Sequence, residues 1–112
     1  MIKNINTKPD IFNHVPEPTI CFSLLDNEKI YGYIIYNVVG ELAGIHSEIF
    51  KWNHIIARKL KKDFDSTIRK VKKLGVKKIV ASHMGKDEKW EKFIKLYGFP
   101  KPQLTMMSIK EV

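Results

Sequence analysis

The stretch Val76–Phe99, VKKIVASHMGKDEKWEKFIKLYGF, decides how the rest of the chain is interpreted. Its first residues, VKKIVA, include a short apolar run of strand length. A polar loop with one glycine follows, and Asp87 is a good helix N-cap. Apolar residues then recur at helical spacing: Trp90, Phe93, Ile94 and Tyr97. Gly98 and Phe99-Pro100 end this helix. The stretch therefore predicts a strand, a loop and a helix.

Three strands are predicted upstream, at Thr19–Leu25, Lys29–Val39 and Leu42–Phe50. Each is rich in aliphatic and aromatic residues and is bounded by turn residues, at 26–28 and at Gly40-Glu41. The first two strands predict an antiparallel hairpin, and the third extends it to a meander. Gly32, inside the second strand, indicates a β-bulge or a close approach of another backbone.

One long amphipathic helix is predicted after the meander. Apolar residues recur every three or four positions between residues 52 and 74: Trp52, Ile56, Leu60, Phe64, Ile68, Val71 and Leu74. Gly75 ends this helix. Because the helix connects two strands of one sheet, strand Leu42–Phe50 and the strand after Gly75 should be parallel neighbours.

A last strand at Gln103–Lys110 completes the predicted order β-β-β-α-β-α-β. This order predicts an α/β (α+β) fold, in which helices pack on a mixed sheet. The length of 112 residues fits a single domain over residues 1–112. Residues 1–18 contain three prolines and little periodicity, so we expect a loosely structured N-terminal arm there.

Composition narrows the functional classes. The chain is 44% hydrophobic and carries a net charge of +8, which favours anionic partners. Its single cysteine, Cys21, lies in an apolar run and is expected to be a small buried hydrophobe in a reducing, cytoplasmic setting. We expect no membrane association, since no segment reaches the ~18 apolar residues of a membrane span and no signal-peptide core is evident.

The order of elements and the ending WEKFIKLYGF resemble the GNAT superfamily of N-acetyltransferases. In that family a late strand leads to a helix of the approximate form N-x-x-A-x-x-x-Y-x-x-x-G-F. Counting back from Gly98 places Asp87 at the Asn position, Trp90 at the Ala position and Ile94 at the Tyr position. The resemblance covers about residues 19–110. It implies a GNAT-like mixed sheet, acetyl-CoA as acetyl donor and an amine as acceptor.

Two positions depart from the family pattern. The family's R/Q-x-x-G-x-G/A loop, which holds the CoA pyrophosphate, falls at residues 55–60 when Gly75 is used as the anchor, and these residues contain no glycine. Ile94 cannot transfer a proton to the departing thiolate. Small phage-encoded GNAT-like proteins show similar departures, and the chain resembles them. The resemblance implies acetyl-CoA contacts at five residues: Phe50, Lys51, Arg58, Lys59 and Asp87.

His46 and Glu48 are the candidate general bases. They lie two residues apart on a predicted strand, so both side chains project from one face. In the family this strand carries the base that deprotonates the acceptor amine, and a histidine titrates at about 6.5, near working pH. The alternative is that both residues are merely solvent-facing. His83, in the loop after the next strand, is a weaker candidate of the same kind.

The basic face of the long helix supports a second, non-catalytic function. Only two acidic residues, Asp63 and Asp65, interrupt the basic residues of this face. Its cations predict binding to nucleic acid or to an acidic protein through five residues: Lys61, Lys62, Arg69, Lys70 and Lys73. The chain would then be a phage accessory or virion-associated protein, in the host cytoplasm or the virion. An exposed edge strand could also support a homodimer. A gap between the two parallel strands beside the start of the helix would favour the enzyme.

Overall fold

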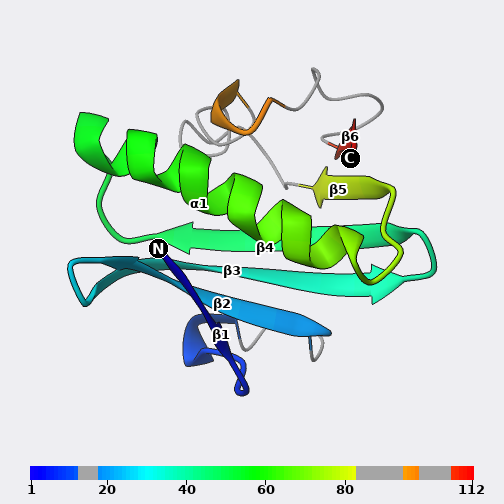
Figure 1. The fold of residues 1–112 in the computed structure, drawn as a ribbon, viewed down its shortest axis with the longest axis horizontal. Helices are drawn as coiled ribbons and strands as arrows, with labels where there is room; N and C mark the ends of the chain where they lie inside the picture. The colour runs from blue at the N-terminus through cyan, green and yellow to red at the C-terminus, as the bar shows by residue number, and fades with distance from the viewer. Residues whose placement is uncertain (13–17, 83–94, 99–106) are drawn as a thin grey trace.

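The computed structural model of the protein describes residues 1–12, 18–82, 95–98 and 107–112. Within these residues it contains six strands, one 3-10 turn and one long helix: β1 (Ile2–Ile5), η1 (Asp10–Phe12), β2 (Ile20–Asp26), β3 (Lys29–Val39), β4 (Leu42–Ile49), α1 (His54–Lys72), β5 (Lys78–Ser82) and β6 (Met107–Glu111). The strands form one mixed sheet in sequence order, β1-β2-β3-β4-β5-β6 (Figure 1).

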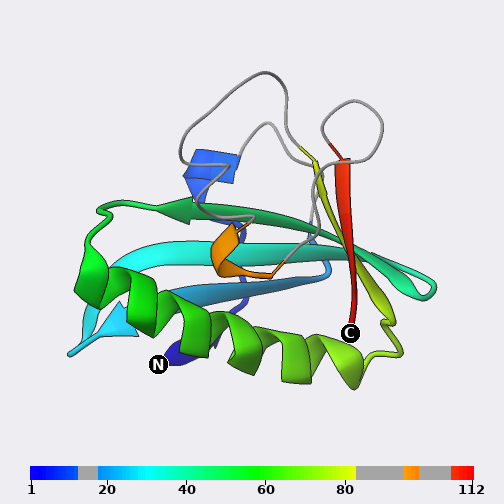
Figure 2. The ribbon, with the colours of Figure 1, turned by 90° about the horizontal axis from the view of Figure 1, so that it is seen from above.

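The sheet is antiparallel except at one place. β4 and β5 are parallel, and α1 is the crossover between them, as predicted. The helix lies across one face of the sheet, whereas η1 lies on the other (Figure 2). The predicted α+β fold, with a helix packed on a mixed sheet, is therefore confirmed, although the order of elements differs in part.

The main core lies between α1 and the sheet. Leu60 and Phe64 of α1 are fully or almost fully buried, and they belong to the same cluster as Ile34 and Tyr36 of β3. A smaller cluster on the opposite face joins Phe12, Cys21 and Ile35, which confirms Cys21 as a buried small hydrophobe. This alternation along β3 assigns its even-numbered residues from Ile34 to the helical side and its odd-numbered residues to the other side.

The hairpin between β2 and β3 explains Gly32. Asn27 and Glu28 both have positive φ, 49° and 72°, as a two-residue turn between twisted strands requires. The pairing shifts from Leu24↔Gly32 to Leu25↔Ile30, so Tyr31 is the extra residue of a bulge. A Cβ on Gly32 would lie 2.5 Å from the carbonyl oxygen of Glu48. The predicted bulge and close approach are both present.

The N-terminal segment differs from its prediction. Residues 1–18 were expected to form a loosely structured arm, but Ile2–Ile5 form strand β1, paired antiparallel with β2. Ile2 packs against the main core and Ile5 against the smaller cluster, because side chains alternate across a strand. The sequence did not predict this strand, because only four residues carry the alternation and their partner strand, β2, is distant in sequence.

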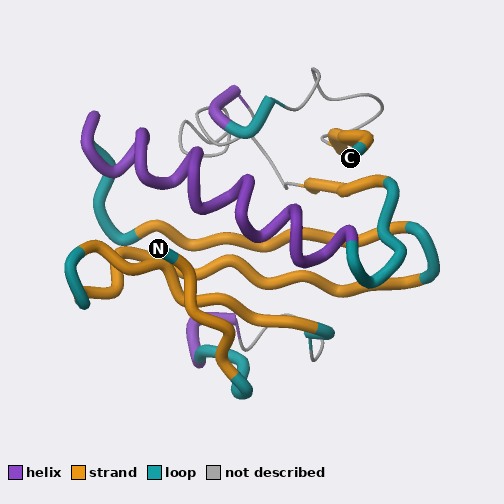
Figure 3. Tube along the Cα trace, in the orientation of Figure 1, coloured by secondary structure: helices purple, strands orange, loops and turns teal. Residues whose placement is uncertain are grey.

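The other element bounds agree within a few residues. The long helix spans His54–Lys72, where residues 52–74 were expected (Figure 3). Residues 95 and 96 are helical and Gly98 has φ 71°, as the expected second helix and its glycine stop require. Four positions of that helix lie outside the described residues: Asp87, Trp90, Phe93 and Ile94. The final strand is described from Met107 to Glu111.

Replacing Gly32 by alanine should destabilise the fold. The new Cβ would collide with the Glu48 carbonyl, and overpacking of this kind typically costs about 2 kcal/mol. Gly44→Ala is the matched control, because an added Cβ at Gly44 meets nothing within 4 Å. Urea denaturation of both variants checks this expectation, and equal unfolding free energies would contradict it.

Candidate functional site

The parallel pairing of β4 and β5 ends early. The two strands pair at three positions, Leu42↔Lys78, Ala43↔Ile79 and Gly44↔Val80. Ile45 and His46 come next on β4 but do not pair with Ala81 and Ser82, which pair with β6 instead. The separated ends lie on the side where β4 leads into α1 (Figure 1). Among the described residues, the β4–β5 pairing therefore ends before either strand does, and an open gap at this place stays a prediction.

The helix α1 begins at His54, after a four-residue connection from the end of β4. Asn53 is its N-cap, and the Asn53 side chain accepts a hydrogen bond of 2.9 Å from the backbone N–H of Ile56. The connection from β4 is residues 50–53, so residues 55–60, where the family's phosphate loop was placed, already belong to the helix. The family's phosphate loop also opens the long helix, so this placement stays a prediction, and the helix itself starts after its asparagine cap.

An open, mainly apolar pocket of about 390 Å³ lies between α1 and the segment 95–98. Among the described residues its lining consists of Trp52, Ala57, Lys61, Lys95 and Leu96. Ala57 and Lys61 are one turn apart on α1, and segment 95–98 lies beside the helix in both ribbon views (Figures 1 and 2). Trp52, Ala57 and Leu96 supply apolar surface, and the exposed lysines Lys61 and Lys95 supply positive charge.

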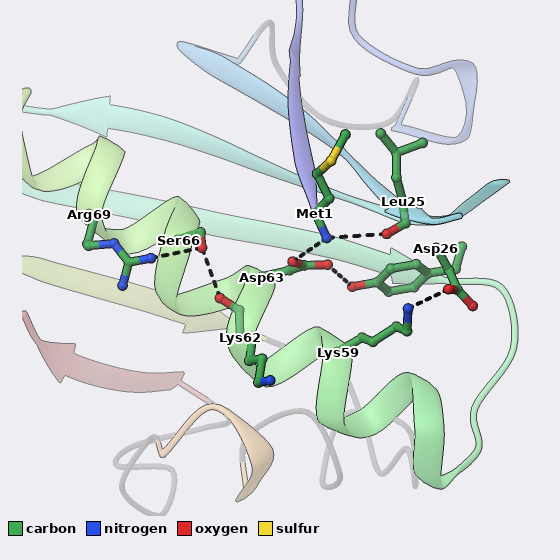
Figure 4. Close-up of polar contacts among 9 residues, drawn as sticks. Met1, Leu25, Asp26, Lys59, Lys62, Asp63, Ser66 and Arg69 are labelled. Atoms are coloured by element: carbon green, nitrogen blue, oxygen red, sulfur yellow. Dashed lines mark hydrogen bonds and ion pairs between the residues drawn. The ribbon is translucent and has the colours of Figure 1, made fainter. Parts of the chain in front are cut away.

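Four of the five predicted acetyl-CoA residues lie in the described part of the chain, and their surroundings differ. Arg58 and Lys51 are exposed, and Phe50 packs edge-to-face on Tyr33 of β3. Lys59 forms an ion pair with Asp26 at the β2–β3 turn (Figure 4), about 200° around the helix from Ala57. Asp87 lies outside the described residues. Their contacts with acetyl-CoA stay predictions.

His46 and Glu48 lie on the sheet face opposite to α1. Ala43, Ile45 and Ile49 point into the main core, so the residues between them point the other way. His46 is opposite Ile35, and Glu48 is opposite Tyr33, on the neighbouring strand β3. Both side chains are half-buried, and His46 is the first β4 side chain on this face beyond the pairing with β5. Their catalytic roles stay predictions; His83 lies outside the described residues.

A buried polar layer ties α1 to the sheet. The hydroxyl of Tyr31 donates to Asp63, whose other carboxylate oxygen accepts a 2.7 Å bond from the Met1 amino group (Figure 4). The Tyr36 and Thr67 hydroxyls lie 2.7 Å apart, and both residues are fully buried. Asp63 therefore points inward, and its expected place on the basic face is wrong.

Tyr97 completes this layer. Its ring stacks on Phe64 at 3.8 Å with an interplanar angle of 1°. Burial raises the pKa of Tyr97, and the neighbouring phenols of Tyr36 and Tyr31 raise it further. Burial also raises the pKa of Tyr31, with a further rise from its bond to Asp63, and raises the pKa of Tyr36. Three phenols are thus held neutral between the helix and the sheet.

Sequence reasoning missed several residues at this site. Neither Lys95 nor Leu96 belongs to the apolar pattern of the predicted second helix, in which Ile94 occupies the family's Tyr position. The sequence marks Tyr33 only as a strand residue. Asn53, directly before the helical pattern, was an available N-cap signal for the true start of α1. For Lys61, spacing of four from Ala57 was the available signal that both share one side of the helix.

The fold of the chain is similar to the folds of two solved structures. It is similar to the ribosomal-protein-S5-alanine acetyltransferase from Vibrio fischeri, with a TM-score of 0.60 and 18% identity over 82% of this chain and 61% of that one. It is also similar to a domain from Methanocaldococcus jannaschii DSM 2661, with a TM-score of 0.63 and 18% identity over 88% of this chain and 70% of that one. At this identity the likeness shows the fold alone. No protein-family model and no curated protein matches the chain.

No helix in the described part of the chain is long and apolar enough to cross a membrane.

The three buried phenols predict a loss of stability in alkali. Each phenol has a raised pKa in the folded state, so this stability is fully present below about pH 10, where unfolded tyrosine begins to ionise. Above that pH the unfolded chain releases protons that the folded chain keeps. Unfolding free energy should then fall by up to about 1.4 kcal/mol per pH unit for each phenol.

Urea denaturation between about pH 9 and pH 11 measures this slope. Tyr36→Phe removes one buried phenol, so its stability should fall about one-third less steeply with pH than that of the unmodified chain. Parallel slopes in the two proteins would contradict the assignment.

Proposed function

We propose that the protein is an acetyl-CoA-dependent N-acetyltransferase. The observation that carries this proposal is the early end of the β4–β5 pairing, on the side of the sheet from which β4 leads into α1. In the GNAT fold a gap at this place admits the acyl-CoA chain. The similarity in fold to an acetyltransferase supports this proposal. The name of that enzyme specifies the alanine of a ribosomal protein. The acceptor amine of this chain is a separate part of the proposal.

The residues that line the pocket between α1 and segment 95–98 fit an acyl-CoA ligand. Trp52 and Leu96 offer apolar surface, Ala57 leaves space, and Lys61 and Lys95 offer positive charge for phosphates. Bound acetyl-CoA would supply the thioester that an amine attacks. Backbone N–H groups of β4 beyond Gly44, which do not pair with β5, would polarise the acetyl carbonyl.

Proton removal from the acceptor is assigned to β4. His46 or Glu48 would accept the proton, since general bases act best when their pKa lies near working pH. Both residues lie on the face of the sheet that α1 leaves uncovered, so an acceptor could approach from that side while acetyl-CoA contacts the other. Arg58, Lys59, Lys51 and Asp87 remain proposed acetyl-CoA contacts, whereas Phe50 packs on Tyr33 on the acceptor side of the sheet.

Calorimetric titration with acetyl-CoA tests the proposal. Lys61→Glu should weaken binding about tenfold, because it removes a positive charge from the pocket and introduces a negative one. Lys62→Glu makes the same charge change on the adjacent residue, which does not line the pocket, and should alter affinity less than about twofold. Absence of binding heat with millimolar acetyl-CoA would refute the proposed function.

A second candidate function is binding of a polyanion through the outer face of α1. The five cations proposed for it are all exposed: Lys61, Lys62, Arg69, Lys70 and Lys73. The inward direction of Asp63 favours this function, because Asp65 is then the exposed acid left on α1. The partner would be nucleic acid or an acidic protein, as for a phage accessory or virion-associated protein. A cytoplasmic location and a homodimer through an edge strand stay predictions.

Fluorescence anisotropy with a labelled DNA duplex measures this second function. Affinity should fall steeply with salt, and reversing the charges of Lys62, Arg69, Lys70 and Lys73 should abolish most of it. Lys61 is kept, so that the acetyl-CoA pocket is unchanged. Reversal of four exposed lysines away from α1, namely Lys3, Lys29, Lys51 and Lys78, is the charge-matched control. Equal affinity of the two variants would exclude a specific role for the helix.

A further inference from the structure

Two aromatic rings and a carboxylate meet on the face of the sheet opposite to α1. Tyr33 and Glu48 are direct partners across β3 and β4. The rings of Tyr33 and Phe50 are 5.7 Å apart at an interplanar angle of 72°. Tyr33 and Glu48 are half-buried, and Phe50 is 52% exposed, so all three side chains are accessible. We call these three residues the aromatic–acid site.

This combination is suited to a cationic ligand. Aromatic rings attract a cation through the negative charge on their faces, and ammonium groups are common ligands of such sites. Directly opposed residues of neighbouring strands have Cβ atoms about 5 Å apart, so the Glu48 carboxylate can reach a cation that touches Tyr33. No ion pair joins Glu48 to any residue in the described ranges. The basic outer face of α1 is on the other side of the sheet.

His46 has different surroundings from Glu48. It lies opposite the buried Ile35 rather than a tyrosine, and it is closer to the place where β4 and β5 separate. An amine held by the Glu48 carboxylate and two rings is stabilised as ammonium, and an ammonium nitrogen has no lone pair for attack. The anchored cation and the reacting amine must therefore be different groups.

We propose that the acceptor is an aliphatic diamine or polyamine, with one ammonium held in the aromatic–acid site and a second, neutral amine presented to His46. This inference rests on the acetyltransferase function proposed above. The neutral nitrogen forms a bond to the acetyl carbon while the carbon–sulfur bond breaks. His46 takes the proton from nitrogen, and the sulfur leaves as thiolate and is protonated to the thiol. Glu48 is then an anchor for the acceptor, and His46 is the base.

The cation site is tested without acetyl-CoA, by NMR titration of the full chain with choline and with its neutral isostere, 3,3-dimethylbutan-1-ol. Choline should bind at least about threefold more tightly than the isostere and should shift the resonances of Tyr33, Glu48 and Phe50. Glu48→Gln should weaken choline binding about fivefold and Phe50→Leu about threefold. Glu111→Gln, the same change at an exposed carboxylate on β6, should have no effect. Equal binding of choline and the isostere would overturn the inference.

The acceptor class is tested by initial rates with putrescine and with butylamine at saturating acetyl-CoA. Putrescine should show a kcat/KM about tenfold higher, and Glu48→Gln should remove this preference mainly through KM. His46→Gln should lower kcat for both amines about 100-fold. Equal rates for the two amines would overturn the diamine assignment alone. Absence of transfer together with intact choline binding would refute the acetyltransferase function and the acceptor role, while supporting the ammonium site.

Discussion

The pairing between β4 and β5 stops after three residue pairs, while each strand continues to pair with its other neighbour. β4 pairs with β3 along its whole length, from Leu42 to Ile49, and β5 pairs with β6 from Lys78 to Ser82. Since adjacent strands of a sheet are twisted relative to one another, two strands that follow different partners diverge once their own pairing ends. Beyond Gly44, the β5-facing backbone groups of β4 then need other hydrogen-bonding partners. A ligand that carries amide groups is such a partner.

The lining of the pocket between α1 and segment 95–98 depends on contacts that fix α1. Tyr36–Thr67 and Tyr31–Asp63 join the helix to β3 through buried hydrogen bonds, which also set the rotation of the helix about its axis. With Asp63 and Thr67 facing the sheet, Ala57 and Lys61 face the pocket. The stack of Tyr97 on Phe64 then attaches the segment 95–98 to the same helix and places Lys95 and Leu96 opposite Lys61. The polar layer therefore positions the site as well as stabilising the fold.

Sequence periodicity was sufficient to predict the meander, the crossover and the parallel pair, because each of these elements has enough apolar residues to define a face. It was insufficient to predict structure where few residues carry the pattern, as in β1, or where a polar residue has a buried partner. Asp63 looked like surface charge because nothing in the local sequence reveals the Tyr31 hydroxyl and the Met1 amino group beside it. The candidate bases His46 and Glu48 were found by strand alternation, but only the cross-strand partners distinguish them. These partners, Ile35 and Tyr33, belong to another strand, so the difference between His46 and Glu48 depends on tertiary structure and is not visible in the local sequence.

The connection between β4 and α1, residues 50–53, contains no glycine, and this changes how phosphate would be held. A glycine-rich loop presents backbone N–H groups in a fixed geometry, whereas here the N–H of Ile56 is already bonded to the Asn53 side chain. Charge must then come from side chains, and Lys61 and Lys95 are suitably placed in the pocket. A lysine binds phosphate as a mobile point charge and not through a rigid set of donors. Binding by such residues depends on ionic strength and discriminates little between phosphate positions. Selectivity for the ligand would therefore come from the apolar pocket and the unpaired part of β4, and the basic helix would supply attraction.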